Sequence, residues 1–165
     1  MEAFGLKGMT DLDLQDALMA ELERMVEGDE LTWSNGTEWR KPHVFKQDKP
    51  YKYDTDPYDQ EDYVIVMLDD EDEREDGEWV VTVAFIVDIW FVDEDRQGNV
   101  KLADLMNRIY YHFKENHFTD GRYVMGTGAK KRFNQEAFPE HYEGALITKW
   151  RLPETEPIGI RQFLA

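Results

Sequence analysis

Apolar side chains line both faces of one long segment, residues 79–92, in the middle of the chain. Alternate residues of an extended strand point to opposite faces. Every position on one face is apolar: Val81, Val83, Phe85, Val87, Ile89 and Phe91. The other face carries Val80, Thr82, Ala84, Ile86, Asp88, Trp90 and Val92. Because polar residues are rare on either side, we predict a long central strand that is covered on both faces.

Two other segments carry apolar residues at helical spacing. Residues 11–27 form an amphipathic pattern, for which Thr10 and Asp13 provide a capping box and Gly28 provides an exit. The stripe of this helix consists of Leu14, Ala17, Leu18, Leu22 and Met25. The second helix has its stripe at Leu102, Leu105, Met106, Ile109 and Phe113. Both stripes are typical of helices that pack on a core.

Further strands are predicted on both sides of the central one. Tyr63–Leu68 is short and apolar, and the acidic residues 69–78 follow it, so we expect a hairpin with a long, mobile tip. The later strand candidates are Arg122–Gly126, Lys131–Asn134 and Gly144–Leu152. The expected fold class is α+β, with a mostly antiparallel sheet of about four to five strands and two main helices packed against it.

Residues 29–60 do not follow a regular pattern. Asn35-Gly36 indicates a hairpin between residues 31–34 and 37–40. Aromatic residues and prolines are scattered through the rest, so we expect an extended aromatic arm or loop that packs on the domain or docks on a neighbouring subunit. At 165 residues the chain fits a single domain, 1–165, with a loose or wrapping tail at 153–165. The candidate interface residues are Trp33, Trp39, Tyr51, Tyr53, Tyr58, Asp88 and Trp90.

The net charge of −17 is distributed unevenly. Residues 54–78 hold 13 acidic residues and one base, Arg74. Such runs are typical of solvated loops, although a surface that repels or imitates DNA is an alternative. Phosphate recognition needs clustered cations, and Lys130-Lys131-Arg132 is the one basic cluster in the sequence. We therefore expect no direct nucleic-acid binding. No apolar run approaches the length of about 18 residues that a membrane span needs, and no signal peptide is visible.

Residues 93–104 match part of a calcium-binding EF-hand loop. Asp93, Asp95, Gly98 and Asp104 occupy positions one, three, six and twelve. However, position five is the uncharged Gln97, position twelve is the shorter aspartate, and a strand precedes the loop where the motif needs a helix. We favour a strand-to-helix turn in which Gly98 supplies an unusual backbone angle and Asn99 caps the helix. No metal site and no cofactor is therefore predicted.

The sequence contains none of several common catalytic or phosphate-binding motifs. The chain has no cysteine, and neither a phosphate-binding glycine loop nor a nucleophile elbow is present. Asp88 is an acid inside the apolar strand and therefore needs an explanation. Such a residue is more often hydrogen-bonded at a sheet margin or an interface than catalytic. We therefore do not expect an enzyme.

The element order is informative in itself. The helix 11–27 comes first, Tyr63-Val64-Ile65-Val66 then leads into the acidic connection, and a strand follows that ends in Val87-Asp88-Ile89-Trp90. A turn, the helix 102–113 and the strand Ala145-Leu146-Ile147-Thr148-Lys149-Trp150 complete it. This order, over residues 10–152, resembles the tail-terminator and tail-completion proteins of long-tailed bacteriophages.

The resemblance implies a structural protein of the virion tail or neck that is assembled in the bacterial cytoplasm. Such a subunit forms a ring with copies of itself, usually a hexamer, which caps the tail tube and joins it to the head connector. Two alternatives remain open. An acidic DNA mimic would inhibit a DNA-binding protein, and a small calcium-binding module would depend on residues 93–104.

Overall fold

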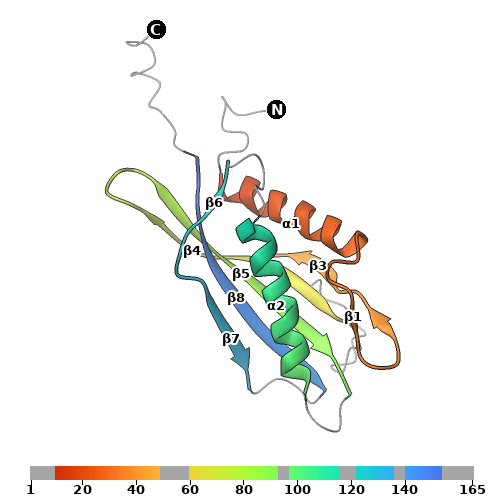
Figure 1. The fold of residues 1–165 in the computed structure, drawn as a ribbon. Helices are drawn as coiled ribbons and strands as arrows, with labels where there is room; N and C mark the ends of the chain where they lie inside the picture. Colours follow the sequence, from red (N-terminus) through yellow and green to blue (C-terminus); the bar gives the residue numbers. More distant parts are fainter. Residues whose placement is uncertain (1–9, 49–59, 93–96, 116–121, 136–139, 154–165) are drawn as a thin grey trace, which may run out of the picture.

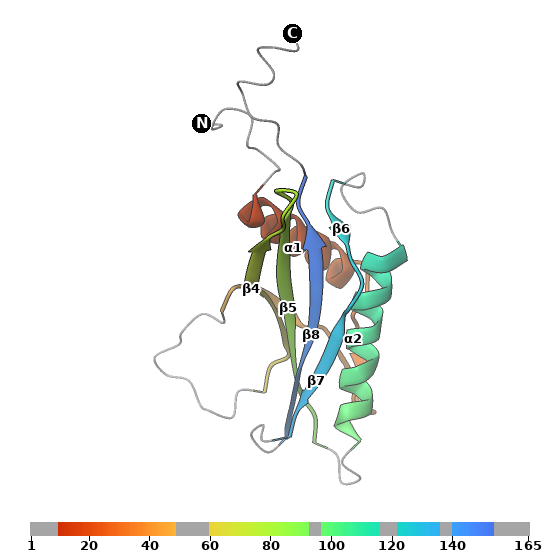
Figure 2. The ribbon, with the colours of Figure 1, turned by 90° about the vertical axis from the view of Figure 1, so that its left-hand side faces the viewer.

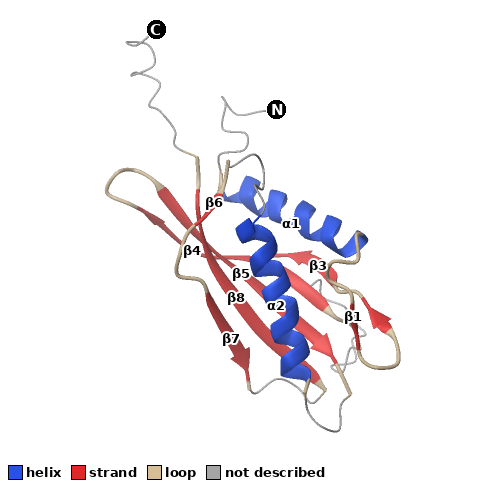
Figure 3. Cartoon of the chain, viewed as in Figure 1, coloured by secondary structure: helices blue, strands red, loops and turns tan. Residues whose placement is uncertain are grey.

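The computed structural model describes residues 10–48, 60–92, 97–115, 122–135 and 140–153. Its helices are α1 (Asp11–Glu27) and α2 (Gly98–Glu115). Its strands are β1 (Trp33–Ser34), β2 (Trp39–Arg40), β3 (His43–Lys46), β4 (Tyr63–Glu73), β5 (Trp79–Trp90), β6 (Val124–Met125), β7 (Lys130–Asn134) and β8 (His141–Arg151). Figure 3 shows these helices and strands by colour.

Within the described residues the main sheet has six strands, and Figure 1 shows their arrangement. Its order is β3-β4-β5-β8, and both β6 and β7 pair with the outer side of β8. All of these pairs are antiparallel except β3 with β4, which is parallel. The predicted α+β class is thus confirmed, with more strands than the four to five expected.

Both helices lie on the same face of the sheet (Figure 2). The predicted apolar face of β5 points toward them, and Val83, Phe85 and Val87 are fully buried there. Phe85 stacks on Phe113 of α2 with 5.6 Å between the ring centroids. The opposite face, which we call the helix-free face, has no described helix over it. Its centre consists of Ile65, Ala84, Ile86, Ala145 and Ile147, which are neighbours across β4, β5 and β8.

Helix α1 begins as predicted. Thr10 and Asp13 form the capping box, in which the Asp13 amide donates to the Thr10 hydroxyl and the Thr10 amide donates to the Asp13 carboxylate, each at 3.2 Å. The helix ends at Gly28 as predicted, and Gly28 is its C-cap with an ordinary φ of −85°. The left-handed conformation falls on the next residue, Asp29, at a φ of 62°. Aspartate adopts this conformation more readily than most residues, so glycine is not needed there.

Helix α2 starts at Gly98, four residues before the first apolar residue of its stripe, Leu102. Gly98 is not in the left-handed region, so the unusual backbone angle predicted for it is wrong. The reason for glycine is steric, since a Cβ atom at this position would lie 2.1 Å from the ring of Tyr142. Asn99 lies within the helix instead of capping it.

The region 29–60 contains more regular structure than predicted. The Asn35-Gly36 hairpin is confirmed, with β1 and β2 joined by residues 35–38, and the Asn35 side chain accepts hydrogen bonds from the amides of Thr37 and Glu38. The strand β3 was not predicted. Residues 49–59, with Tyr51, Tyr53 and Tyr58, lie outside the described residues.

The hairpin of β4 and β5 differs most from its prediction. Strand β4 continues through a bulge between Leu68 and Glu71 as far as Glu73, so most of the predicted mobile connection is strand. A short turn closes the hairpin, in which the Arg74 amide donates to the Glu78 carbonyl at 2.8 Å. The expected long connection at residues 69–78 is therefore wrong in extent, because main-chain pairing with β5 holds these acidic residues in the sheet.

The three late strands are confirmed as β6, β7 and β8. Beyond Pro153 the predicted tail lies outside the described residues. None of the helices in the described ranges is long and apolar enough to span a membrane.

Candidate functional site

A buried carboxylate joins the hairpin β1–β2 to the main sheet. The side chain of Asp62 is fully buried, and its oxygens accept hydrogen bonds from Trp33 Nε1 and Arg40 Nε, both at 2.9 Å. The main-chain amide of Trp90 donates to the same carboxylate at 2.8 Å. The Arg40 guanidinium also lies 5.4 Å from the centre of the Trp90 ring. These contacts fix residues from three distant segments around one charge pair.

This arrangement gives two predicted interface residues an internal role. Trp33 is only 2% exposed and packs on Phe91 with 5.6 Å between the ring centroids. Trp90 is half-buried beneath Arg40. Burial is the largest single effect and lowers the pKa of Arg40, but the hydrogen bonds and charges of Asp62 and Glu38 together raise the pKa above its usual value. Arg40 is therefore a cation in the folded protein, and its contacts with Asp62 lie within the subunit.

Asp88 occupies the helix-free face and is 4% exposed. One carboxylate oxygen lies 2.6 Å from His141 Nδ1, and the other accepts a hydrogen bond from the Tyr63 hydroxyl at 3.1 Å. Burial raises the pKa of the neighbouring Glu143, and Asp88 adds to the rise, while a hydrogen bond from Asn134 opposes it. Asp88 thus has the hydrogen bonds that we expected, and it connects β4, β5 and β8.

The Asp88–His141 pair has the composition of a general acid–base pair, which would need a nucleophile or a positioned substrate beside it. The one serine of the chain, Ser34, lies in the hairpin β1–β2 and accepts a hydrogen bond from the amide of Gly36. The contacts that the structure does show for Asp88, with Tyr63 and His141, join β4, β5 and β8.

Only part of the candidate calcium loop lies within the described residues. Asp93 and Asp95 lie outside the described residues, and Gln97 is exposed just before α2. Asp104 lies in the second turn of α2, where its carboxylate is 2.6 Å from Arg108. A calcium loop must wrap its later positions around the ion, whereas Gly98–Asp104 is helical here. Within the described part of the chain, no group of three or more metal-ligating side chains is found.

Large exposed side chains mark the surface. Trp39, a predicted interface residue, is 76% exposed at the hairpin β1–β2. Trp79 and Phe133 are 43% and 36% exposed and were not predicted as interface residues. Their signal in the sequence was the presence of an aromatic side chain beside a run of charge, acidic before Trp79 and basic before Phe133.

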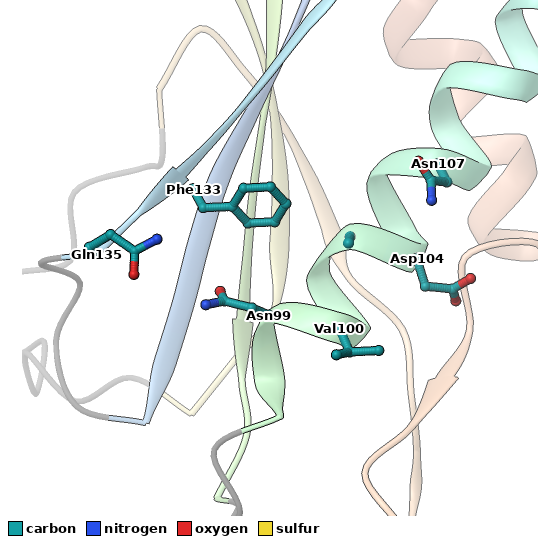
Figure 4. A pocket seen from close by; sticks show the side chains of 7 residues that line it. Asn99, Val100, Asp104, Asn107, Phe133 and Gln135 are labelled. Carbon is teal, nitrogen blue, oxygen red and sulfur yellow. The ribbon is translucent and has the colours of Figure 1, made fainter.

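A shallow groove separates α2 from β7 (Figure 4). Its volume is about 570 Å³. It is lined by Asn99, Val100, Ala103, Asp104, Asn107, Phe133 and Gln135. The ring of Phe133 points into the groove toward α2, while the side chain of Asp104 points away from the groove (Figure 4). The groove is open and contains no buried charge, so it resembles a contact surface more than a catalytic pocket.

Charge is separated between the two margins of the sheet. All five residues of β4 from Asp69 to Glu73 are acidic, and we call them the acidic edge. The strand β7 at the opposite margin, Lys130–Asn134, contains three cations and is exposed along its length, and we call it the basic edge. These two edges and the exposed aromatic residues are the candidate contact surfaces of the described chain.

Comparisons with known proteins do not assign this chain to a family. No protein-family model matches it, and no curated protein matches it.

Proposed function

We propose that this protein is a structural subunit of a bacteriophage tail or neck, of the tail-terminator or tail-completion kind, which acts by assembly. The observation that carries the proposal is the element order α1, β4–β5 hairpin, α2 and β8, on which the resemblance rests. In that order the strand Val87-Asp88-Ile89-Trp90 is central, and α2 is the next element along the chain.

The surface supports an assembly role. Among the described residues, β7 and the end of β4 have no strand partner on their outer sides, and exposed aromatic side chains such as Trp39 provide contact area. The acidic charge also suits a ring through which DNA passes, since an acidic lumen repels phosphate. In this proposal the subunit binds copies of itself, the tail tube and the head connector, and it needs no cofactor.

The test is deletion of the gene from its parent phage or prophage, followed by electron microscopy of the particles. We expect filled heads without joined tails, and free tails of abnormal length. Supplying the intact gene from a plasmid should restore normal virions, and the same plasmid with an early stop codon should not. Normal virions from the deletion strain would overturn the proposal.

An acidic DNA mimic remains the second candidate, because the hairpin β4–β5 concentrates eight acidic residues between Asp69 and Glu78. A mimic spreads carboxylates over a face at the spacing of phosphates, whereas these acids lie at the end of one hairpin (Figure 1). Tight inhibition of a DNA-binding enzyme by the purified protein, together with normal virions after deletion, would favour the mimic.

A further inference from the structure

The main sheet leaves the acidic edge without a strand partner. Strand β3 pairs with β4 only from Tyr63 to Val66, and Gln47 extends these contacts to Leu68. Among the described residues no strand pairs with the outer side of β4 from Asp69 to Glu73. The hairpin projects beyond both helices at this end (Figure 1). A segment with exposed amides and carbonyls is thus available for pairing with another strand.

The basic edge is exposed in the same way. Strand β7 pairs with β8 on one side, and no described strand pairs with its other side. Lys130 and Arg132 point to the helix-free face beside Ile147 and Ala145, and neither forms an ion pair with a described residue. Lys131 donates to Asn107 on the helix side. Two cations at this margin therefore lack an acidic partner within the described chain, although the protein has a large excess of acids.

Charged edges commonly prevent sheets from pairing with one another. Here each edge repels a copy of itself, since acidic residues would oppose acidic residues and cations would oppose cations. The acidic edge of one copy and the basic edge of another nevertheless attract each other. The pattern therefore disfavours the two pairings between like edges and favours the pairing of the acidic edge with the basic edge.

The favoured pairing cannot form within one chain. Strands β5 and β8 lie between the two edges in the sheet, so the acidic and basic edges are on opposite margins. We propose that the acidic edge of one copy of this protein adds as a strand to the basic edge of a second copy. The occupant of each edge is thus a second copy of the same chain, and the contact is head to tail.

Aromatic side chains add apolar contact to this charged interface. Trp79 is opposite Glu73 in the hairpin and is 43% exposed, and Phe133 belongs to the basic edge itself. Interfaces depend on such anchors more than on exposed charge pairs, which mainly select the partner and the register. A head-to-tail contact closes into a ring when its rotation allows. The ring rests on the function proposed above, whereas the contact between two copies is measurable without any phage component.

The experiment measures self-association of the full chain by sedimentation at physiological ionic strength. Under these conditions screening reduces the repulsion between whole subunits and leaves close contacts largely intact, because the Debye length is about 8 Å. We expect the double variant Lys130→Glu, Arg132→Glu to associate at least about tenfold more weakly than the unchanged chain. The control Lys101→Glu, Lys114→Glu changes the net charge equally but lies on α2, and it should associate as the unchanged chain does.

Mixing gives the sharper test. The variant Asp70→Lys, Asp72→Lys carries a reversed acidic edge, and like the reversed basic edge it should not associate with itself. A mixture of the two reversed variants should associate again, because each edge then meets its opposite. A misfolded variant would not associate in the mixture either. Recovery of association would therefore show that each variant is folded and that the reversed charges alone prevented self-association.

Chemical cross-linking detects the contact even where association is weak. A carbodiimide joins lysine to carboxylate without a spacer, so mixed isotope-labelled and unlabelled chains should give peptides that link Lys130 to residues 69–73 of the other copy. A chain that remains monomeric at high concentration and gives no such peptide would overturn the proposal, as would association that both reversals leave unchanged. Defective tails in the deletion phage would still support the proposed function in that case, because another surface could form the ring.

Discussion

At the residue scale, Asp62 shows how a charged side chain can organise a core. It belongs to the acidic stretch that the sequence pattern assigned to solvated loops, yet it is buried against Trp33 and Arg40. Its partners lie 29 and 22 residues away along the chain. No local pattern distinguishes Asp62 from its exposed neighbours, because its role depends on which segments the fold brings together.

We predict that Asp62→Ala destabilises the protein by about 3–5 kcal/mol, since it leaves the Arg40 charge, the indole N–H of Trp33 and the main-chain amide of Trp90 without their acceptor. Urea unfolding followed by tryptophan fluorescence measures the change. The control Glu75→Ala, in the exposed hairpin turn, should change stability by about 0.5 kcal/mol or less. A loss below about 1 kcal/mol for Asp62→Ala would show that water replaces the carboxylate at low cost.

Glu71 should make stability depend on pH. Burial and the neighbouring carboxyl of Asp11 raise the pKa of Glu71 from 4.5 to about 7. A pKa that is raised in the folded state means that the native protein binds the proton more tightly, so the contribution to stability is present below pH 4.5 and is lost as pH rises to about 7.

The variant Glu71→Gln should therefore lose this part of the pH dependence and unfold at a higher urea concentration than the unchanged chain at neutral pH. Glu75→Gln, in the exposed turn, should keep the pH dependence of the unchanged chain. Parallel stability curves for Glu71→Gln and the unchanged chain would contradict the assignment.

At the element scale, the spacing of apolar residues predicted those helices and strands that bury an apolar face. Both helices and β5 bury continuous apolar stripes, so their residue patterns identified them. The strand β3 was missed because it is short and lies at the margin, where His43 and Lys46 are exposed and no alternation results. The end of β4 was taken for a loop since all five residues are acidic, although pairing with β5 keeps them extended.

The candidate contact surfaces were predicted only in part. Trp39 is exposed as an interface residue requires, whereas Trp33 has the same side chain six residues earlier and is buried. Composition cannot separate the two, because exposure depends on the hairpin and on the position of Asp62. The basic cluster Lys130-Lys131-Arg132 was recognised as a cluster, but its position on a free edge required the sheet order.

The contact of α2 with β8 depends on a glycine. A methyl group at Gly98 would overlap the ring of Tyr142, so Gly98→Ala should cost about 1–3 kcal/mol despite the higher helix propensity of alanine. The control Gly126→Ala should be nearly neutral, since its methyl group would lie 3.7 Å from the nearest atom.

The double variant Gly98→Ala, Tyr142→Ala supplies the second test, measured by urea unfolding. It should be less destabilised than the sum of the two single variants, because removal of the ring relieves the overlap. Strict additivity would show that the cost of Gly98→Ala has another origin.

At the scale of the whole molecule, charge is organised as well as abundant. The net charge is −17, and the acids of the hairpin β4–β5 project at one end while the cations of β7 lie along the opposite margin. A net charge of this size makes copies of the protein repel one another in solution. It also destabilises the folded state, because like charges within the chain repel one another. This repulsion between copies disfavours non-specific contacts. The pairing of an acidic edge with a basic edge is therefore selective.

The same organisation predicts how stability responds to salt. Raising the ionic strength from about 0.01 M to about 0.15 M shortens the Debye length from about 30 Å to about 8 Å, which weakens repulsion among the hairpin acids. The melting temperature should therefore rise. The variant Asp70→Asn, Asp72→Asn should show a rise smaller by about 2–4 °C, which corresponds to about 1 kcal/mol for a chain of this size. The control Glu23→Gln, Glu27→Gln removes two exposed acids from α1 and should keep most of the rise. If the melting temperatures of both variants rise equally with salt, the destabilising repulsion comes from the total charge of the protein and not from the acidic edge.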